Sequence, residues 1–161
     1  MDPVKPVEAP TLEGRRQTLV AMWKEVREHG RQHETQRAVA TNLILLLASA
    51  DIAAISSLGI GLRSTPLALA LVVLGALGYL ITAKYYERFQ RNTAIAFEIE
   101  QRLAELDPEL GWREAKDRAI AFHKARRPKM HRIRLNKIWS YLHLIVLAAG
   151  TAIFVLCLAL G

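Results

Sequence analysis

Three long apolar runs interrupt an otherwise charged sequence. The run from Val39 to Leu62 contains one acidic or basic side chain, Asp51, and the run from Leu67 to Ala83 contains none. The last run, 138–161, contains only His143. A helix that crosses the ~30 Å hydrocarbon core of a bilayer needs about 20 apolar residues. The pattern therefore predicts an all-α integral membrane protein with three transmembrane helices, placed at 39–62, 66–83 and 138–161.

The charged segment before the first run has a helical pattern of its own. Three prolines among the first ten residues remove backbone donors, so we expect a disordered leader over 1–10. Thr11 then suits a helix N-cap, and apolar residues recur at intervals of three, four and seven through a predicted cytoplasmic amphipathic helix at 11–36. The middle of its apolar stripe is formed by Leu19, Met22, Trp23 and Val26. This helix is expected to lie on the membrane or to dock on the rest of the protein. Its charge predicts an uncleaved first span.

Turn residues divide the rest of the chain. Thr65 and Pro66 suit an N-cap and a first helical residue, so 37–83 is predicted to form a transmembrane hairpin with a short external turn. No helix breaker lies between Leu67 and Leu106, which predicts one long helix that leaves the membrane. Its predicted cytoplasmic part keeps an apolar stripe at Phe89, Ala96, Ile99, Leu103 and Leu106.

The segment 84–137 is predicted to be a cytoplasmic helical hairpin with a basic end. Asp107 and Pro108 stop one helix and start the next. The second helix has one apolar face, formed by Trp112, Ala115, Ala119 and Phe122. Because a short turn joins this face to the stripe of the preceding helix, we expect the two helices to pack antiparallel. Pro128 is expected to end the hairpin, and a last helix is predicted from 129 to the C-terminus.

The distribution of basic residues indicates the orientation of the spans. The chain has 22 Lys and Arg and a formal net charge of +7. Seven of these residues precede the first span, one (Arg63) lies between the first two spans, fourteen lie in 84–137, and none follows. By the positive-inside rule, the N-terminus and 84–137 are predicted to be cytoplasmic, and the C-terminus is predicted to lie outside.

The densest charge lies from His123 to Lys137, which contains seven Lys or Arg, two His and no carboxylate. One interpretation is an anchor to anionic lipid headgroups, worth ~1 kcal/mol per basic residue near the surface. The other is a site for a polyanion such as a nucleotide or an oligonucleotide. The candidate phosphate-binding residues are Arg88, Arg91, Lys124, Arg126, Arg127, Lys129, Arg132 and Arg134.

Asp51 lies at the middle of the first span, where a charge costs at least ~2.5 kcal/mol on insertion scales. It is either a carboxylate of a pore or proton path, or a protonated acid hydrogen-bonded to a neighbouring helix. Asn42, Ser49 and Ser56 recur every seven residues on the same helix, where they either line water in an oligomer or allow close helix packing. These four residues are the candidate pore or gate residues.

Other residues of the spans have simpler expected roles. Gly75 and Gly78 in the second span, and 149–152 in the third, are expected to let helix backbones approach closely. Tyr79, Tyr141 and His143 share a depth near the inner surface and are expected to form an interfacial belt.

No pattern indicates an enzyme, a cofactor or a metal site. His29 and His33 have the i, i+4 spacing of a metal-binding pair, but the glutamate that follows the first histidine in zinc proteases is absent, and no third ligand is evident. The sequence has no Gly-rich phosphate loop and no nucleophile elbow. Its single cysteine, Cys157, excludes an internal disulfide.

The order of these features resembles that of the transmembrane effector of the Hailong anti-phage defence system. The resemblance rests on an amphipathic helix before the first span, a second span that continues into KYYERFQ (84–90), an alanine- and charge-rich hairpin, and RIRLNKIWSYLH (132–143) at the entry to the last span. It covers the whole chain.

This resemblance implies a tetrameric ion channel in the bacterial inner membrane, held closed by single-stranded DNA oligomers that a companion nucleotidyltransferase makes. The N-terminal helix would act as a lock through Leu19, Met22, Trp23 and Val26, and basic residues of the cytoplasmic layer would hold the DNA phosphates. Loss of the DNA would free the helix, and ion flow would arrest or kill the infected cell.

Two other functions fit the residues. One is a non-conducting membrane adaptor whose cytoplasmic hairpin recruits a partner and whose basic run binds anionic lipid. The other is a subunit of a larger transporter or secretion complex. Three short spans cannot enclose a pore in one subunit, so the channel interpretation requires a homo-oligomer.

Overall fold

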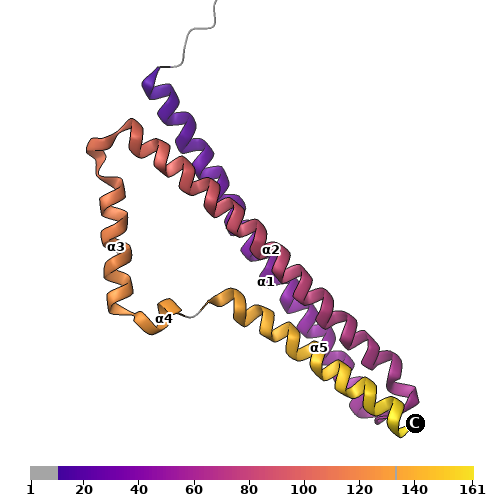
Figure 1. Cartoon of the computed structure of the whole chain (residues 1–161). Helices are drawn as coiled ribbons and strands as arrows, with labels where there is room; N and C mark the ends of the chain where they lie inside the picture. Colours follow the sequence, from indigo (N-terminus) through magenta and orange to yellow (C-terminus); the bar gives the residue numbers. More distant parts are fainter. Residues whose placement is uncertain (1–10, 133) are drawn as a thin grey trace, which may run out of the picture.

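The computed structural model describes residues 11–132 and 134–161. These residues contain five α-helices: α1 (Leu12–Leu58), α2 (Thr65–Leu106), α3 (Trp112–Arg126), α4 (Pro128–Arg132) and α5 (Leu135–Leu160) (Figure 1). The 3-10 turns η1 (Leu62–Ser64) and η2 (Pro108–Leu110) precede α2 and α3. Three helices, α1, α2 and α5, are long and apolar enough to cross a membrane. The all-α class and the three candidate transmembrane helices are thus confirmed, and the predicted leader at 1–10 lies outside the described residues.

The amphipathic helix and the first span are one continuous helix, α1. Thr11 is its N-cap, as predicted, and the Thr11 side chain accepts a hydrogen bond of 3.1 Å from the backbone N–H of Gly14. The helix continues from the charged segment into the candidate span because no proline interrupts it. Its one internal glycine after the first turn, Gly30, is buried beside Phe89 of α2. It ends at Gly59, whose φ of 77° favours glycine.

A heptad pattern on α2 explains how α1 and α2 pair. Inward-facing buried and half-buried positions recur at alternating steps of three and four residues: Ala68, Leu71, Gly75, Gly78, Thr82, Tyr85, Phe89, Asn92, Ala96, Ile99, Leu103 and Leu106. This spacing keeps one face of a helix turned toward a partner over its whole length. α1 lies antiparallel to α2 along this seam (Figure 1). The two helices therefore form one long hairpin that extends well beyond the candidate spans.

The structure corrects the partner predicted for the part of the seam that lies beyond the candidate spans. The stripe that includes Phe89 and Ile99 packs on α1, and α3 diverges from α2 after the η2 turn (Figure 1). No described residue of α3 is buried, and Trp112 and Phe122 are 47% and 66% exposed. Two features explain the difference: α1 extends a seam already formed in the spans, and Gly111, at φ 57°, redirects the chain before α3.

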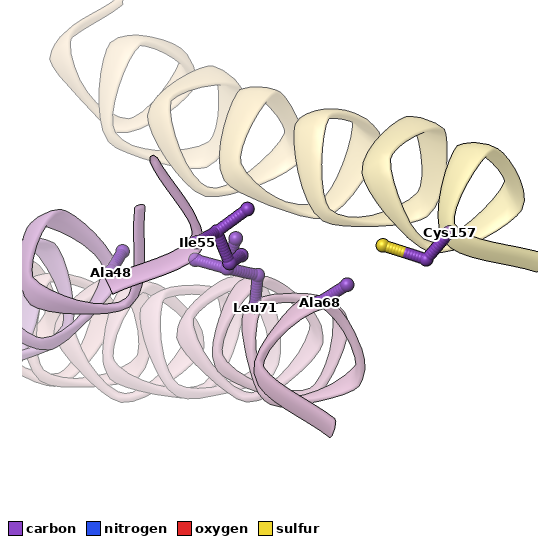
Figure 2. Packing of buried hydrophobic residues seen from close by; sticks show 5 residues of the cluster. All are labelled: Ala48, Ile55, Ala68, Leu71 and Cys157. Atoms are coloured by element: carbon purple, nitrogen blue, oxygen red, sulfur yellow. The ribbon is translucent and has the colours of Figure 1, made fainter. Parts of the chain in front are cut away.

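The third candidate span, α5, packs closely on α2 through glycines. A Cβ at Gly75 would lie 2.6 Å from Leu147 Cα, and one at Gly150 would lie 2.7 Å from the backbone nitrogen of Val72. The predicted role of Gly75, and of Gly150 within 149–152, in close helix approach is therefore confirmed. Deeper in the same bundle, a small apolar core joins the three helices (Figure 2); its members are Ala48, Ile55, Ala68, Leu71 and Cys157.

The predicted last helix is two helices. α4 begins at Pro128 and is short, and α5 begins at Leu135. Arg134 has an extended backbone, with φ −93° and ψ 106°, which is incompatible with a helix that continues through it. As a result α3 and α4 lie beside the bundle and not on it (Figure 1).

Candidate functional site

The predicted polar stripe lies on the outer surface of α1. Asn42, Ser49 and Ser56 are all exposed. The hydroxyls of Ser49 and Ser56 donate to the backbone carbonyls of Leu45 and Ile52, at 2.7 and 2.9 Å. Large apolar side chains make up most of the surrounding exposed surface. The stripe is therefore a polar strip on the apolar exterior of a single subunit.

Asp51 does not share a face with this stripe. It follows Ser49 by two residues, which puts the two side chains about 200° apart around the axis of α1. Asp51 is half-buried, whereas the stripe is exposed. The structure thus brings Asn42, Ser49 and Ser56 together and leaves Asp51 on another side of the helix. One lumen along α1 can be lined by the stripe or by Asp51, but not by both.

Three of the four residues of the predicted lock, Leu19, Trp23 and Val26, lie on the side of α1 that docks on α2. The Trp23 indole Nε1–H donates a hydrogen bond of 3.1 Å to Glu100 Oε1. Leu19 and Val26 are half-buried, but Met22 is 47% exposed and does not belong to the docked face. Further toward the membrane, the rings of His33 and Tyr85 lie 6.0 Å apart. The N-terminal part of α1 is therefore held along α2 by aromatic and hydrogen-bond contacts.

Glu100 also holds α3. The other oxygen of its carboxylate accepts a hydrogen bond from Lys116 Nζ, and this ammonium lies 5.6 Å from the centroid of the Phe97 ring. The Glu100 side chain is only 15% exposed. One carboxylate on α2 thus connects the N-terminal part of α1 with the helix that leads to the basic segment. Sequence reasoning missed it because Trp23 and Glu100 are 77 residues apart.

All eight predicted phosphate-binding residues are exposed, and within the described ranges none of them forms an ion pair. Six of the eight lie in 124–134, at the end of α3, in α4 and just before α5. The guanidinium of Arg126 lies 5.9 Å from the centroid of the Phe122 ring. This segment is an accessible basic surface, which we call the basic arm (124–134).

Arg88 and Arg91 are separate from the basic arm and lie on α2 beside a carboxylate. A hydrogen bond from Lys84, followed by the Lys84 charge, lowers the pKa of Glu87. The charges of Arg91 and Arg88 act in the same direction. Part of the positive field of these two arginines is therefore already directed at Glu87, which makes them weaker candidates for a phosphate than the basic arm.

A buried polar layer, which the sequence did not reveal, lies where α1, α2 and α5 meet, at the end of the candidate spans that adjoins the charged segments. Arg37 is 6% exposed, and Thr41, Thr82 and His143 are 1%, 1% and 0% exposed. Thr41 Oγ1 and His143 Nε2 are 3.2 Å apart. His143 therefore does not belong to the predicted interfacial belt, although Tyr79 and Tyr141 are exposed.

His143 fits between the helices because Gly78 leaves room for it. A Cβ at Gly78 would lie 2.6 Å from His143 Cε1.

His29 is exposed, and the structure places His33 beside Tyr85. Within 11–132 and 134–161 no group of three metal-binding side chains occurs.

No protein-family model, no curated protein and no solved structure matches this chain.

Proposed function

We propose that this chain is the subunit of a homo-oligomeric ion channel of the inner membrane that serves as a gated effector of anti-phage defence. The observation that carries the proposal is the exposed polar strip of Asn42, Ser49 and Ser56 on the surface of α1. In a bilayer the Asn42 amide of this strip is favourable only against water or against another helix, whereas the hydroxyls of Ser49 and Ser56 already donate to backbone carbonyls of α1. Assembly around α1, with a tetramer as the expected state, would place the strip along a central lumen.

The gate in this proposal is the N-terminal part of α1. Its docking on α2 through Trp23 and Glu100 supports a closed state that is held by specific contacts. An anionic ligand, expected to be a single-stranded DNA oligomer made by a companion nucleotidyltransferase, would bind the basic arm. Glu100 and Lys116 would then link ligand binding at α3 to the position of α1. Loss of the ligand would release α1 and open the channel.

A membrane adaptor is the second candidate function, and one observation favours it. The face of α3 that carries Trp112 and Phe122 is exposed in the single subunit. Such a face suits a protein partner. An adaptor would recruit that partner without conducting ions, and its basic arm would bind anionic lipid.

Binding of single-stranded DNA by the detergent-purified oligomer tests the proposal. A fluorescent single-stranded oligonucleotide and its duplex control are titrated at several salt concentrations. We expect single strands to bind more tightly than the duplex, and the logarithm of the affinity to fall linearly with the logarithm of the salt concentration. The slope of this line should be shallower in the double variant Arg126→Ala, Arg127→Ala. Arg15→Ala with Arg16→Ala, a pair of exposed arginines on α1, is the matched control and is expected to keep the slope. A monomer that binds neither nucleic acid would favour the adaptor.

A further inference from the structure

The buried polar layer contains more hydrogen-bonding atoms than its own side chains satisfy. Buried side-chain atoms without a hydrogen-bond partner among the described residues are His33 Nδ1, Arg37 Nε, Thr82 Oγ1, Trp139 Nε1 and His143 Nδ1. These atoms come from 33–37 of α1, Thr82 of α2 and 139–143 of α5. Unsatisfied buried polar atoms are rare and costly in proteins, so a cluster of them points to a group that completes it.

The chemistry of the cluster selects an acceptor with negative charge. Arg37 Nε–H and Trp139 Nε1–H can only donate. The Arg37 guanidinium lies 5.8 Å from the centroid of the Trp139 ring, so these two donors belong to one neighbourhood. The Arg37 charge is poorly neutralised. Its nearest carboxylate, that of Glu34, is 3.9 Å away, and the Glu34 side chain is 48% exposed.

The position of the cluster identifies the oxyanion as a phosphate at the membrane surface. Arg37 lies just before the first candidate span, Thr82 lies near the end of the second, and Trp139 lies at the start of the third. Exposed Lys137, two residues before Trp139, adds positive charge nearby. Tryptophan and basic residues at such a boundary are typical of sites for anionic headgroups. The site is distinct from the basic arm, whose six Lys and Arg side chains are all exposed.

We infer that Arg37 and Trp139 form a binding site for a phosphate oxyanion, the headgroup phosphate of an anionic phospholipid, inserted where α1 and α5 meet. The Arg37 side chain keeps 7% of its surface exposed, and a phosphate would reach the site from this small exposed part. A lipid bound there would join α1 to α5. This inference does not depend on ion conduction or on nucleic-acid binding.

Thermal unfolding of the delipidated, detergent-purified protein tests the site. The probes are phosphatidylglycerol, diacylglycerol as the phosphate-free lipid, and inorganic phosphate. We expect phosphatidylglycerol to raise Tm and diacylglycerol to leave it unchanged, because binding to the folded state alone stabilises it. The same rise with inorganic phosphate would identify a free anion as the ligand and would overturn the assignment to a lipid. No rise with either phosphate-containing probe would overturn the site altogether.

Variants assign the effect to the two residues. Arg37→Gln is expected to abolish the lipid-dependent rise, and Trp139→Phe, which keeps the ring but loses the N–H, to reduce it. Arg31→Gln is the matched control on α1, since the Arg31 side chain is 74% exposed and pairs with Glu28; it is expected to keep the full rise. If Arg37→Gln does not fold, Trp139→Phe decides alone. An unchanged rise in Trp139→Phe, or an equal loss in Arg31→Gln, would contradict the inference.

Discussion

Glu100 shows how a single carboxylate can connect three helices. One oxygen accepts the Trp23 indole N–H, and the other accepts the Lys116 ammonium. Hydrogen bonds to a charged acceptor contribute about 1.5–3 kcal/mol when they are shielded from water, and Glu100 is mostly shielded. Removal of the carboxylate would leave Trp23 without its partner. The same change would free α3 from α2.

Replacement of Glu100 by alanine is therefore expected to loosen the N-terminal part of α1. Amide hydrogen exchange should accelerate in residues 12–30, with protection reduced by about 1–3 kcal/mol in free energy. Glu100→Gln keeps an oxygen for Trp23 but loses the charge for Lys116, so it should protect α1 better than Glu100→Ala does. Glu98→Ala, an exposed carboxylate on the same helix, is the control. Equal exchange in Glu98→Ala and Glu100→Ala would show that Glu100 has no special role.

Glu87 provides a test of local electrostatics where α2 leaves the candidate span. Its pKa lies below the ordinary 4.5, mainly because of the hydrogen bond from Lys84. Since the folded pKa is lower than the unfolded one, the ionised form stabilises the fold above pH 4.5, and this contribution disappears as the pH falls through the folded pKa. In a carboxyl NMR titration, Lys84→Met should move the Glu87 pKa up toward 4.5. Arg102→Met, which removes the partner of Glu105, should leave it unchanged.

At the scale of helices, the α2 seam determines the architecture. In the candidate span Gly75 and Gly78 of the seam admit α5, and beyond the span α1 packs on larger seam residues such as Tyr85 and Phe89. Close backbone approach replaces the hydrophobic effect as the source of packing energy inside a bilayer. The position of α5 therefore depends on glycines, because an added methyl group would occupy the space that α5 takes.

Gly78→Ala tests this dependence directly. The added Cβ would lie 2.6 Å from His143 Cε1, so α5 must shift or His143 must move. We expect a loss of about 1–3 kcal/mol in stability, measured as a lower Tm in detergent. Gly61→Ala is the matched control, because no atom lies within 4 Å of a Cβ at that position. An equal Tm for the two variants would contradict the close packing of α2 and α5.

The sequence predicts the helices better than it predicts their partners. Apolar runs and the Thr11 cap determine α1, α2 and α5 locally, so these elements follow from spacing alone. The pairing of α1, and not α3, with the part of α2 beyond the candidate span does not follow from spacing alone. Both helices have an apolar face, and only the continuity of the seam decides between them. The buried layer around Arg37 and His143 was missed for the same reason: it is assembled from three distant segments.

At the scale of the whole molecule, the subunit is a long α1–α2 hairpin with α5 against its candidate spans and a basic arm beside it (Figure 1). The polar strip on α1 lies in the spans, and the docked lock lies beyond them on the same helix. Because α1 is continuous, a displacement of its N-terminal part is transmitted to the strip as movement of one rigid element. This coupling is the physical basis of the proposed gate.

Ion flux from proteoliposomes tests that coupling most directly. Vesicles loaded with potassium and reconstituted with the wild-type chain, Trp23→Ala or Ser49→Leu are compared, with Ser57→Leu as the matched control on a neighbouring side of α1. With the single-stranded DNA ligand present, we expect low flux for the wild type and high flux for Trp23→Ala. Without the ligand, we expect flux in the wild type and in Ser57→Leu, and a flux at least several-fold lower in Ser49→Leu. Vesicles that remain tight with every variant, with or without the ligand, would contradict a channel.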